Sequence, residues 1–550
     1  MAKSPLFHQL RRSLKIANFC QKNQLSTEAG REKFAALESQ IFRQTSRRKF
    51  LTNMGKWAAV GTTLGLGSSQ LHQALAAPKP IDIKVAIIGA GLAGLACGYE
   101  LKKKGINATL FEASNRTGGR CYTLGGAFPT TTNFPGQVAE RGGEFIDNLH
   151  KTLLGYAKEF RLELEDFSKQ PGEVFYYINN QRYSETAIVA EFRQFVDAMR
   201  DDLRTLSGAP TAANHTQADR ILDFTPLDDY LNSRGAGNLI TAVIDAAYTG
   251  EYGLNLDQQS CLNLLLYIHA DRRSKFRPFG VYSDERYHIV GGNQQIAVNL
   301  QLQLPGQIQF NKQLIAARKD SANKVELTFA DGFSDKYDLV VFAIPFSTLR
   351  QVDLDETLNL PQEKRFAIAN LTYGTNSKLM VGFERRPWLE QGGNGSSYAD
   401  LPHLQGTWET NPIRATSNRA ILTDYTGGNL GALLNPNQLQ QETSDFLNDL
   451  NRVFPGSLTA ARRNGNDFAA YLENWRLNPL FQGSYTCNQP GYFTNIADNE
   501  GKPVDNLYFI GEHANSFYEW QGFMEGAALS GVQAASQIVR VVTGNNGRGA

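Results

Sequence analysis

Short apolar runs bounded by glycine or proline recur along the chain and predict buried strands. The first two runs, at residues 83–88 and 108–111, are separated by a segment with apolar side chains at helical spacing. Strands covered on both faces read as continuous apolar runs, so this order predicts a strand, a helix and a second, parallel strand. Runs at 338–345 and 507–510 predict two further strands, and a helical apolar pattern follows over about 522–542.

A glycine-rich turn joins the first predicted strand to the helix. It contains Gly89, Gly91 and Gly94 in Gly-x-Gly-x-x-Gly spacing, and the next strand ends at Glu112. Such glycines let the backbone turn tightly and approach a pyrophosphate, while the helix directs its positive end at the phosphates. Glu112 lies about 20 residues further on, where a carboxylate can hydrogen-bond ribose hydroxyls. The turn therefore predicts a Rossmann-type dinucleotide-binding unit.

Composition narrows the possible partners. The chain has 550 residues, a formal net charge of +1 and 41% hydrophobic residues, so it can bury a large core. It carries no clustered positive charge of the kind that nucleic acids require, and we expect no nucleic-acid partner. Its five cysteines lack Cys-x-x-Cys spacing, so the sequence predicts neither a zinc site nor a disulfide framework, and no metal.

An export signal is predicted ahead of the dinucleotide-binding unit. Arg47 and Arg48 are followed by an apolar, glycine-rich run at 57–67 and by a small-residue site at 74–76. This run is shorter than the roughly 20 residues that span a bilayer. The pattern is typical of a twin-arginine signal, here 46–77, with cleavage after Ala76. We therefore expect recognition by the twin-arginine export machinery and a periplasmic or equivalent extracytoplasmic location. Residues 1–45 form an N-terminal extension that this signal does not explain.

Several further segments resemble those of flavoproteins. Gly119 and Arg120 resemble the glycine-arginine segment of glutathione-reductase-like flavoproteins, which implies that Arg120 faces the phosphates of FAD. Gly142 and Gly143 resemble the segment by which amine oxidases pass close under the flavin. At the far end of the chain, the resemblance places four residues around the same cofactor: Trp475, Gly511, Glu512 and Met524. The helix that starts beside Met524 can stabilise negative charge on a reduced flavin.

From about residue 83 to 543 the chain resembles the flavin-containing amine oxidase family, which includes monoamine, polyamine and L-amino-acid oxidases. The resemblance implies an α/β fold in which a glutathione-reductase-like FAD-binding Rossmann domain is interleaved with an α+β substrate domain. We expect the FAD-binding domain at 83–150, 286–345 and 471–543. The substrate domain is expected at 151–285 and 346–470.

Three features carry the resemblance to amine oxidases. Lys378 begins a strand and is followed ten residues later by Trp388, which implies a lysine beside flavin N5 that holds a water. Tyr485 and Phe523 fall at the two positions of an aromatic sandwich that confines a small amine. Ser484 replaces the cysteine that monoamine oxidases attach to FAD, so non-covalent FAD is expected.

The implied reaction is removal of a hydride from the α-carbon of an amine to flavin N5. The imine is then hydrolysed to a carbonyl compound and ammonia, and oxygen reoxidises the flavin with formation of hydrogen peroxide. Catalytic roles accordingly fall to Lys378, Tyr485 and Phe523. The sequence leaves open whether oxygen or a quinone accepts the electrons, and whether the chain forms a homodimer.

The sequence is also compatible with an L-amino-acid oxidase. Such an enzyme usually holds the substrate carboxylate with an arginine near Gly142, but Phe145 stands at that place. Arg141, Arg272 or Arg273 could replace it, and acidic residues of the substrate domain (Asp245, Glu251 and Asp257) could favour a basic amino acid or a polyamine. A desaturase-like flavoprotein and a protein with structural FAD stay open as well.

Overall fold

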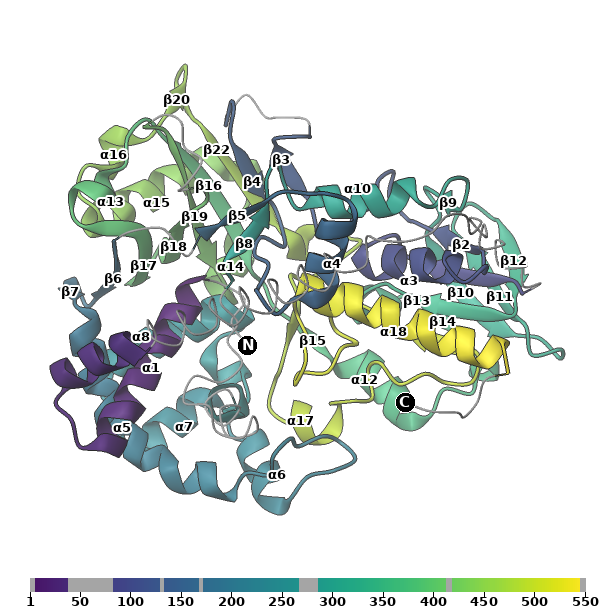
Figure 1. The fold of residues 1–550 in the computed structure, drawn as a ribbon, viewed down its shortest axis with the longest axis horizontal. Coiled ribbons are helices and arrows are strands. Elements are labelled where there is room, and N and C mark those ends of the chain that lie inside the picture. Colours follow the sequence, from purple (N-terminus) through teal and green to yellow (C-terminus); the bar gives the residue numbers. More distant parts are fainter. Residues whose placement is uncertain are drawn as a thin grey trace, which may run out of the picture.

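The computed structural model describes residues 5–37, 83–128, 133–167, 172–266, 285–411 and 418–544. The expected signal region at 46–77, together with Arg272 and Arg273, lies outside these ranges. Figure 1 shows two sheets, each with its own helices, and the N-terminal and C-terminal helices in different halves of the molecule.

A five-stranded parallel sheet forms the first half. Its strand order is β24 (Leu507–Phe509), β13 (Leu339–Phe342), β1 (Val85–Ile88), β2 (Ala108–Phe111) and β9 (Ile308–Gln309). Every strand pair in it is parallel. The apolar runs seen in the sequence therefore mark four of its five strands, and the α/β fold class is confirmed.

Other elements cover both faces of this sheet. Val85 and Ile87 of β1 pack with the helices α3 (Leu92–Lys102) and α18 (Met524–Val542), while Ala86 and Ile88 face the other way. On that other face lies a four-stranded sheet of β12 (Ser334–Tyr337), β11 (Val325–Phe329), β10 (Leu314–Lys319) and β14 (Asp353–Leu354). With both faces covered, the strands can be apolar throughout.

A seven-stranded mixed sheet forms the second half. Its order is β22 (Ala470–Asn474), β16 (Ser377–Phe383), β19 (Ala420–Thr426), β18 (Leu404–Glu409), β17 (Gly393–Leu401), β6 (Glu173–Ile178) and β7 (Gln181–Tyr183). Because β22 pairs with β16, residues 471–474 belong to this sheet, although the sequence placed them in the FAD-binding domain. Similarly, α4 (Lys151–Glu159) packs on α18, although residue 151 was expected to start the substrate domain.

Helices cover the second sheet on both sides. One face packs against α15 (Leu439–Val453), and the other carries α8 (Asn238–Tyr252), α5 (Glu185–Thr205) and α1 (Pro5–Asn23). The N-terminal extension is thus part of this second half, which the sequence did not predict. No helix among the described residues has the length and apolar character to cross a membrane.

Shorter elements complete the two halves. Further helices are α6 (Gln217–Asp223), α7 (Leu227–Ser233), α10 (Gln294–Leu302), α11 (Phe346–Leu349), α12 (Gln362–Asn370), α13 (Pro387–Glu390), α14 (Gly428–Leu433), α16 (Ser457–Ala460) and α17 (Tyr492–Asn495). Two-stranded pairs are formed by β3 (Thr123–Gly125) with β4 (Val138–Glu140), β5 (Leu164–Asp166) with β8 (Tyr287–Ile289), β15 (Thr372–Tyr373) with β23 (Thr486–Cys487), and β20 (Arg463–Asn464) with β21 (Asp467–Phe468).

Candidate active site

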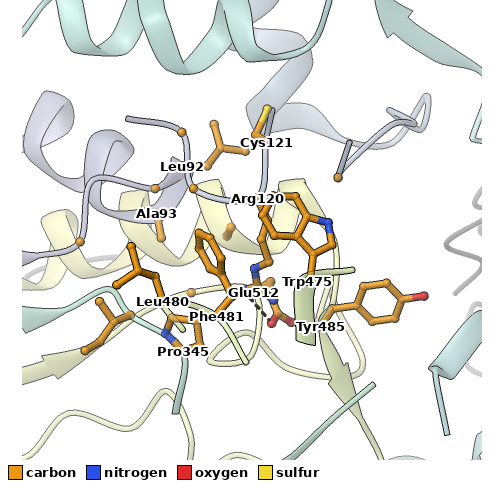
Figure 2. Close-up of a pocket in the computed structure, with 18 of the residues that line it drawn as sticks. Leu92, Ala93, Arg120, Cys121, Pro345, Trp475, Leu480, Phe481, Tyr485 and Glu512 are labelled. Carbon is orange, nitrogen blue, oxygen red and sulfur yellow. Dashed lines mark hydrogen bonds and ion pairs between the residues drawn. The ribbon is translucent and has the colours of Figure 1, made fainter. Parts of the chain in front are cut away.

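An elongated cavity joins the two halves. It begins at the carboxyl ends of the parallel strands. There, Gly89 follows β1, Glu112 follows β2, and Gly511 lies shortly after β24. From these residues the cavity extends to the seven-stranded sheet. Ligands of open α/β sheets bind at this edge of the strands. Figure 2 shows Tyr485 and Leu480 on opposite sides of the lining residues that it draws. All the site residues predicted from the sequence line it except Gly94.

The glycine turn is shaped for close backbone approach. Gly89 has φ +104°, a conformation that side chains disfavour. A Cβ on Gly94 would lie 2.0 Å from the carbonyl oxygen of Gly89, so Gly94 is needed for α3 to start close to the turn. A Cβ on Gly91 would meet nothing, because Gly91 faces the cavity. The N-terminus of α3 therefore opens into the cavity at the place expected for phosphates.

Glu112 occupies the expected place after β2. One carboxylate oxygen accepts from the backbone N–H of Ala90 at 2.8 Å, and the other accepts from the backbone N–H and hydroxyl of Ser114 at 2.9 and 2.7 Å. These bonds fix the carboxylate at the cavity wall and tie the glycine turn to β2. The arrangement fits a dinucleotide whose ribose lies beside Glu112.

Arg120 and Glu512 form an ion pair in the middle of the cavity, which Figure 2 shows as a dashed line. The guanidinium lies 3.2 Å from Glu512 Oε1 and also donates to the carbonyl of Ser484. The hydroxyl of Thr486 donates to the other Glu512 oxygen at 2.8 Å. Segments that are almost 400 residues apart in the sequence therefore meet at one charged contact.

Gly142 and Gly143 line the cavity and also pack closely against other protein segments. A Cβ on Gly142 would lie 1.8 Å from the carbonyl oxygen of Arg120, and a Cβ on Gly143 would lie 2.5 Å from the side chain of Met524. In this structure the two glycines let three protein segments pack closely. Trp475 completes this packing, because its indole N–H donates to the carbonyl of Arg141 at 3.0 Å.

Lys378 projects from β16 into the same region. Strand alternation turns Leu379 and Val381 to the core beside α15, and Lys378 to the opposite face. Its ammonium group donates to Glu144 Oε2 at 2.7 Å, to the carbonyl of Gly142 at 2.8 Å and to the carbonyl of Glu140 at 3.1 Å. These three acceptors match the three hydrogens of the ammonium group. A water bound to Lys378 therefore has to replace one of the three acceptors or share a hydrogen with it.

Glu144 is a site residue to which the sequence assigned no role. It is buried, lines the cavity and accepts from the indole N–H of Trp408 at 3.0 Å as well as from Lys378. The segment Glu140–Phe145 was recognised from its glycines, but only the tertiary structure shows that its acid meets the lysine.

Aromatic side chains form the wall around Lys378. Tyr425 lies directly opposite Lys378 in the β16–β19 register, and its ring centroid is 5.2 Å from that of Trp408. The hydroxyls of Tyr425 and Tyr485 are 2.7 Å apart, and Tyr485 also donates to the carbonyl of Glu251 at 2.5 Å. Trp408 and Tyr425 were missed from the sequence because single aromatic residues in strands are usually core. By contrast, Trp388 is fully buried in the core and donates to Glu409.

Phe523 lines the cavity from the start of α18. It precedes Met524, the first residue of the helix, and its ring makes an edge contact with Trp520 at 5.7 Å. Tyr485 and Phe523 thus line one cavity from different segments of the chain. His513 does not line the described cavity, and burial lowers its pKa to about 4. This agrees with a structural role.

Each positively charged side chain among the described residues that line the cavity is already paired with a carboxylate. Lys378 pairs with Glu144, and Arg120 pairs with Glu512. The remaining two pairs are Arg141 with Glu473 and Lys312 with Asp331. Phe145, at the place of the expected arginine, packs against Trp408 with ring centroids 5.9 Å apart. The described lining therefore offers no unpaired cation for a substrate carboxylate.

The proposed acidic partners of a cationic substrate do not line the described cavity either. Among them, Glu251 accepts from the lining residue Tyr485 through its backbone carbonyl. Among the described residues, no cluster of potential ligands could hold a metal ion.

The fold and the cavity define a dinucleotide-binding oxidoreductase with a second, substrate-binding half. The model of the flavin containing amine oxidoreductases matches residues 92–539, and the chain belongs to this family. Membership implies a flavin cofactor, and the cavity from Glu112 to Tyr485 fits one because it joins the glycine turn to the aromatic wall.

Comparisons with individual proteins agree with this family. The chain is 25% identical over 482 residues to the putative L-amino-acid oxidase YobN of Bacillus subtilis (strain 168), covering 83% of this chain and 95% of that protein. It is 22% identical to an L-amino-acid oxidase of Pseudechis australis, covering 83% and 86%. Among solved structures, cyclohexylamine oxidase from Brevibacterium oxydans IH-35A matches with TM-score 0.71 at 20% identity, covering 84% and 100%. Putrescine oxidase bound to putrescine matches with TM-score 0.68 at 19% identity, covering 83% and 99%.

Proposed function

We propose that this protein is an FAD-dependent amine oxidase whose substrate carries an amino group but no α-carboxylate. The single observation that carries the proposal is the pairing of every described cation that lines the cavity. A carboxylate brought into this lining would lose its hydration without gaining a free cationic partner, which is costly in a buried site. Phe145 instead offers an apolar surface.

The residues of the site have distinct tasks. FAD supplies the hydride acceptor. The rings of Tyr485 and Phe523 hold the amine and keep its α-carbon directed at the acceptor. Trp408 and Tyr425 exclude water from the same end, and Lys378 keeps a positive charge beside it. The imine product is hydrolysed to a carbonyl compound and ammonia, and oxygen receives the electrons, giving hydrogen peroxide.

An L-amino-acid oxidase is the second candidate, because the relatives from Bacillus subtilis and Pseudechis australis carry that name. The two functions can be separated with substrate pairs that differ only in the carboxylate. Anaerobic bleaching of the flavin is measured with cadaverine and L-lysine, and with phenethylamine and L-phenylalanine. We expect bleaching by the amines at rates at least tenfold above those of the amino acids. Faster bleaching by the amino acids would establish the second candidate.

We propose that FAD is bound without a covalent link. Ser484 lines the cavity and donates its hydroxyl to Asn376 at 2.7 Å, whereas Cys487 is buried outside the lining. Cys121 lines the cavity, but burial raises the pKa of its thiol well above the usual value, which suppresses the reactive thiolate. Acid precipitation should release the flavin into the supernatant, and flavin that stays with the precipitate would contradict this proposal.

We also propose that residues 46–77 direct export by the twin-arginine pathway. The arginine pair, the apolar run and the small-residue site support this proposal. Replacing Arg47 and Arg48 with lysines should retain the protein in the cytoplasm of an expressing bacterium, which fractionation followed by immunoblotting measures. An unchanged distribution would contradict it.

A further inference from the structure

The N-terminal helix α1 packs tightly into the substrate half. Ile16, Ala17 and Cys20 have no exposed surface, and neither has the polar Ser13. Figure 1 shows α1 in purple beside α8 and α5. A helix that merely covers a domain buries one stripe and leaves the opposite face in water. Leu10, Arg11 and Leu14 are buried as well, so the buried face of α1 is wider than this one stripe. We infer that α1 contributes to the core of this half.

Charged contacts add to this apolar packing. Arg12 and Arg31 both pair with Glu185, the first residue of α5, at 2.7 and 3.0 Å. Near the far end of α1, the side-chain amide of Gln21 donates to Asp197 at 2.9 Å. Contacts at two separated points on α5 fix the position of α1 along that helix.

A second stretch closes over the outer side of α1. Residues 27–37 are helical, and Phe34 in this stretch is 2% exposed. The rings of Phe19 and Phe34 meet edge to face with centroids 5.7 Å apart, and Arg193 of α5 donates to Thr27 at 2.9 Å. Both α1 and residues 27–37 therefore contribute contacts that hold the segment 5–37 in place.

The segment also reaches the wall of the active site through α8. This helix packs against both α1 and strands of the seven-stranded sheet, and the carbonyl of Glu251 in its last turn accepts from Tyr485. Burial raises the pKa of Tyr248 on the same helix, and the Arg11 guanidinium of α1 opposes that shift. Movement of α1 would therefore disturb the helix that positions Tyr485.

We propose that the segment 5–37 is a permanent part of the substrate half that stays bound when the chain is cut between residues 38 and 82. A protein cut in this interval would then consist of two chains that stay together. The inference does not depend on the proposed amine oxidation or on the export proposed for residues 46–77, because it follows from the contacts of residues 5–37 alone.

The test uses the full flavin-loaded chain with a recognition site for a sequence-specific protease inserted after Ala76. After cleavage, gel filtration is run in native buffer and in urea. We expect the two fragments to coelute in native buffer, to separate in urea, and to unfold within about 2 °C of the uncut protein. Separation in native buffer, with the larger fragment keeping the melting temperature of the uncut protein, would overturn the proposal. Neither readout requires turnover, so failure of the proposed amine oxidation would leave this test intact.

Two neighbouring substitutions supply a matched pair. Ala17 is fully buried and Asn18 is exposed on the same helix. In the cut protein, Ala17→Arg should release the small fragment because it forces bulk and charge into the core, whereas Asn18→Arg should leave it bound. Release of the small fragment should raise the KM for the amine severalfold. The flavin absorbance per chain should change little, because the glycine turn and Glu112 lie in the other half. Equal retention in both variants would show that α1 is not held as proposed.

Discussion

Lys378 Nζ lies 2.7 Å from Oε2 of Glu144, and this contact joins the seven-stranded sheet to the segment Glu140–Phe145. Both side chains are more than nine-tenths buried. Lys378 also donates to two backbone carbonyls, and Glu144 accepts from Trp408. The charges therefore compensate one another, and the pair fixes the end of the cavity where the aromatic wall begins.

The first prediction concerns the stability of this pair. Lys378→Met leaves the Glu144 carboxylate buried without its counter-ion, so the free energy of unfolding should fall by about 3–5 kcal/mol. The double variant Lys378→Met with Glu144→Gln removes both charges and should recover at least half of that loss. Denaturant titrations measure both values. A double variant as unstable as Lys378→Met alone would show that the lysine stabilises the site mainly through its backbone contacts.

The second prediction concerns oxygen. If Lys378 keeps a positive charge beside the flavin, Lys378→Met should slow reoxidation of the reduced enzyme by about 100-fold, since removing one preorganised charged or polar group has effects of this order. Reduction by the amine should change only a few-fold. Stopped-flow mixing with oxygen measures the first rate, and anaerobic mixing with substrate measures the second. Lys319→Met, which breaks a lysine pair with Asp505 away from the cavity, is the control and should change neither rate.

The third prediction concerns substrate choice. Phe145→Arg places a guanidinium where a carboxylate clamp is expected, so the ratio of kcat/KM for L-phenylalanine to that for phenethylamine should rise at least tenfold. Phe145→Met keeps an apolar side chain and should leave the ratio within about twofold, which separates the added charge from the lost ring. An unchanged ratio in a folded, flavin-loaded Phe145→Arg variant would mean that the substrate carboxylate does not approach this position.

The fourth prediction concerns pH. Burial raises the pKa of Glu140 from 4.5 to about 8, and hydrogen bonds from Asn293 and Thr123 only partly oppose this shift. The folded state therefore binds one more proton than the unfolded state between these values. The stabilising contribution is present below pH 4.5 and is lost as the pH rises through about 8, with a slope of at most about 1.4 kcal/mol per pH unit.

Glu140→Gln removes this titration. The free energy of unfolding of the wild type should therefore fall more steeply than that of Glu140→Gln between about pH 6 and 8.5. Asp320→Asn, at a carboxyl group outside the cavity whose pKa is lowered by Lys336, should retain the wild-type slope over this interval. Parallel curves for the wild type and Glu140→Gln would show that Glu140 ionises normally.

The sequence by itself determined the dinucleotide-binding half. Continuous apolar runs predicted β1, β2, β13 and β24, because strands covered on both faces leave that signature. The glycine turn and Glu112 were located by spacing alone, since a backbone that approaches a phosphate needs glycine at fixed intervals. Tyr485, Phe523 and Lys378 were located by resemblance, and the structure places all three on one cavity.

Only the tertiary structure decided how distant charges pair and where the first residues of the chain lie. The Lys378–Glu144 contact spans 234 positions, and no local pattern encodes it. The pairing of β16 with β19 brings Tyr425 beside Lys378, and the pairing of β18 with β19 brings Trp408 into the same sheet. For α1, the sequence shows apolar residues but not the surface that buries them, because burial is a property of the packed domain. Local periodicity thus specified the strands and the cofactor turn, whereas long-range packing specified the substrate end of the site.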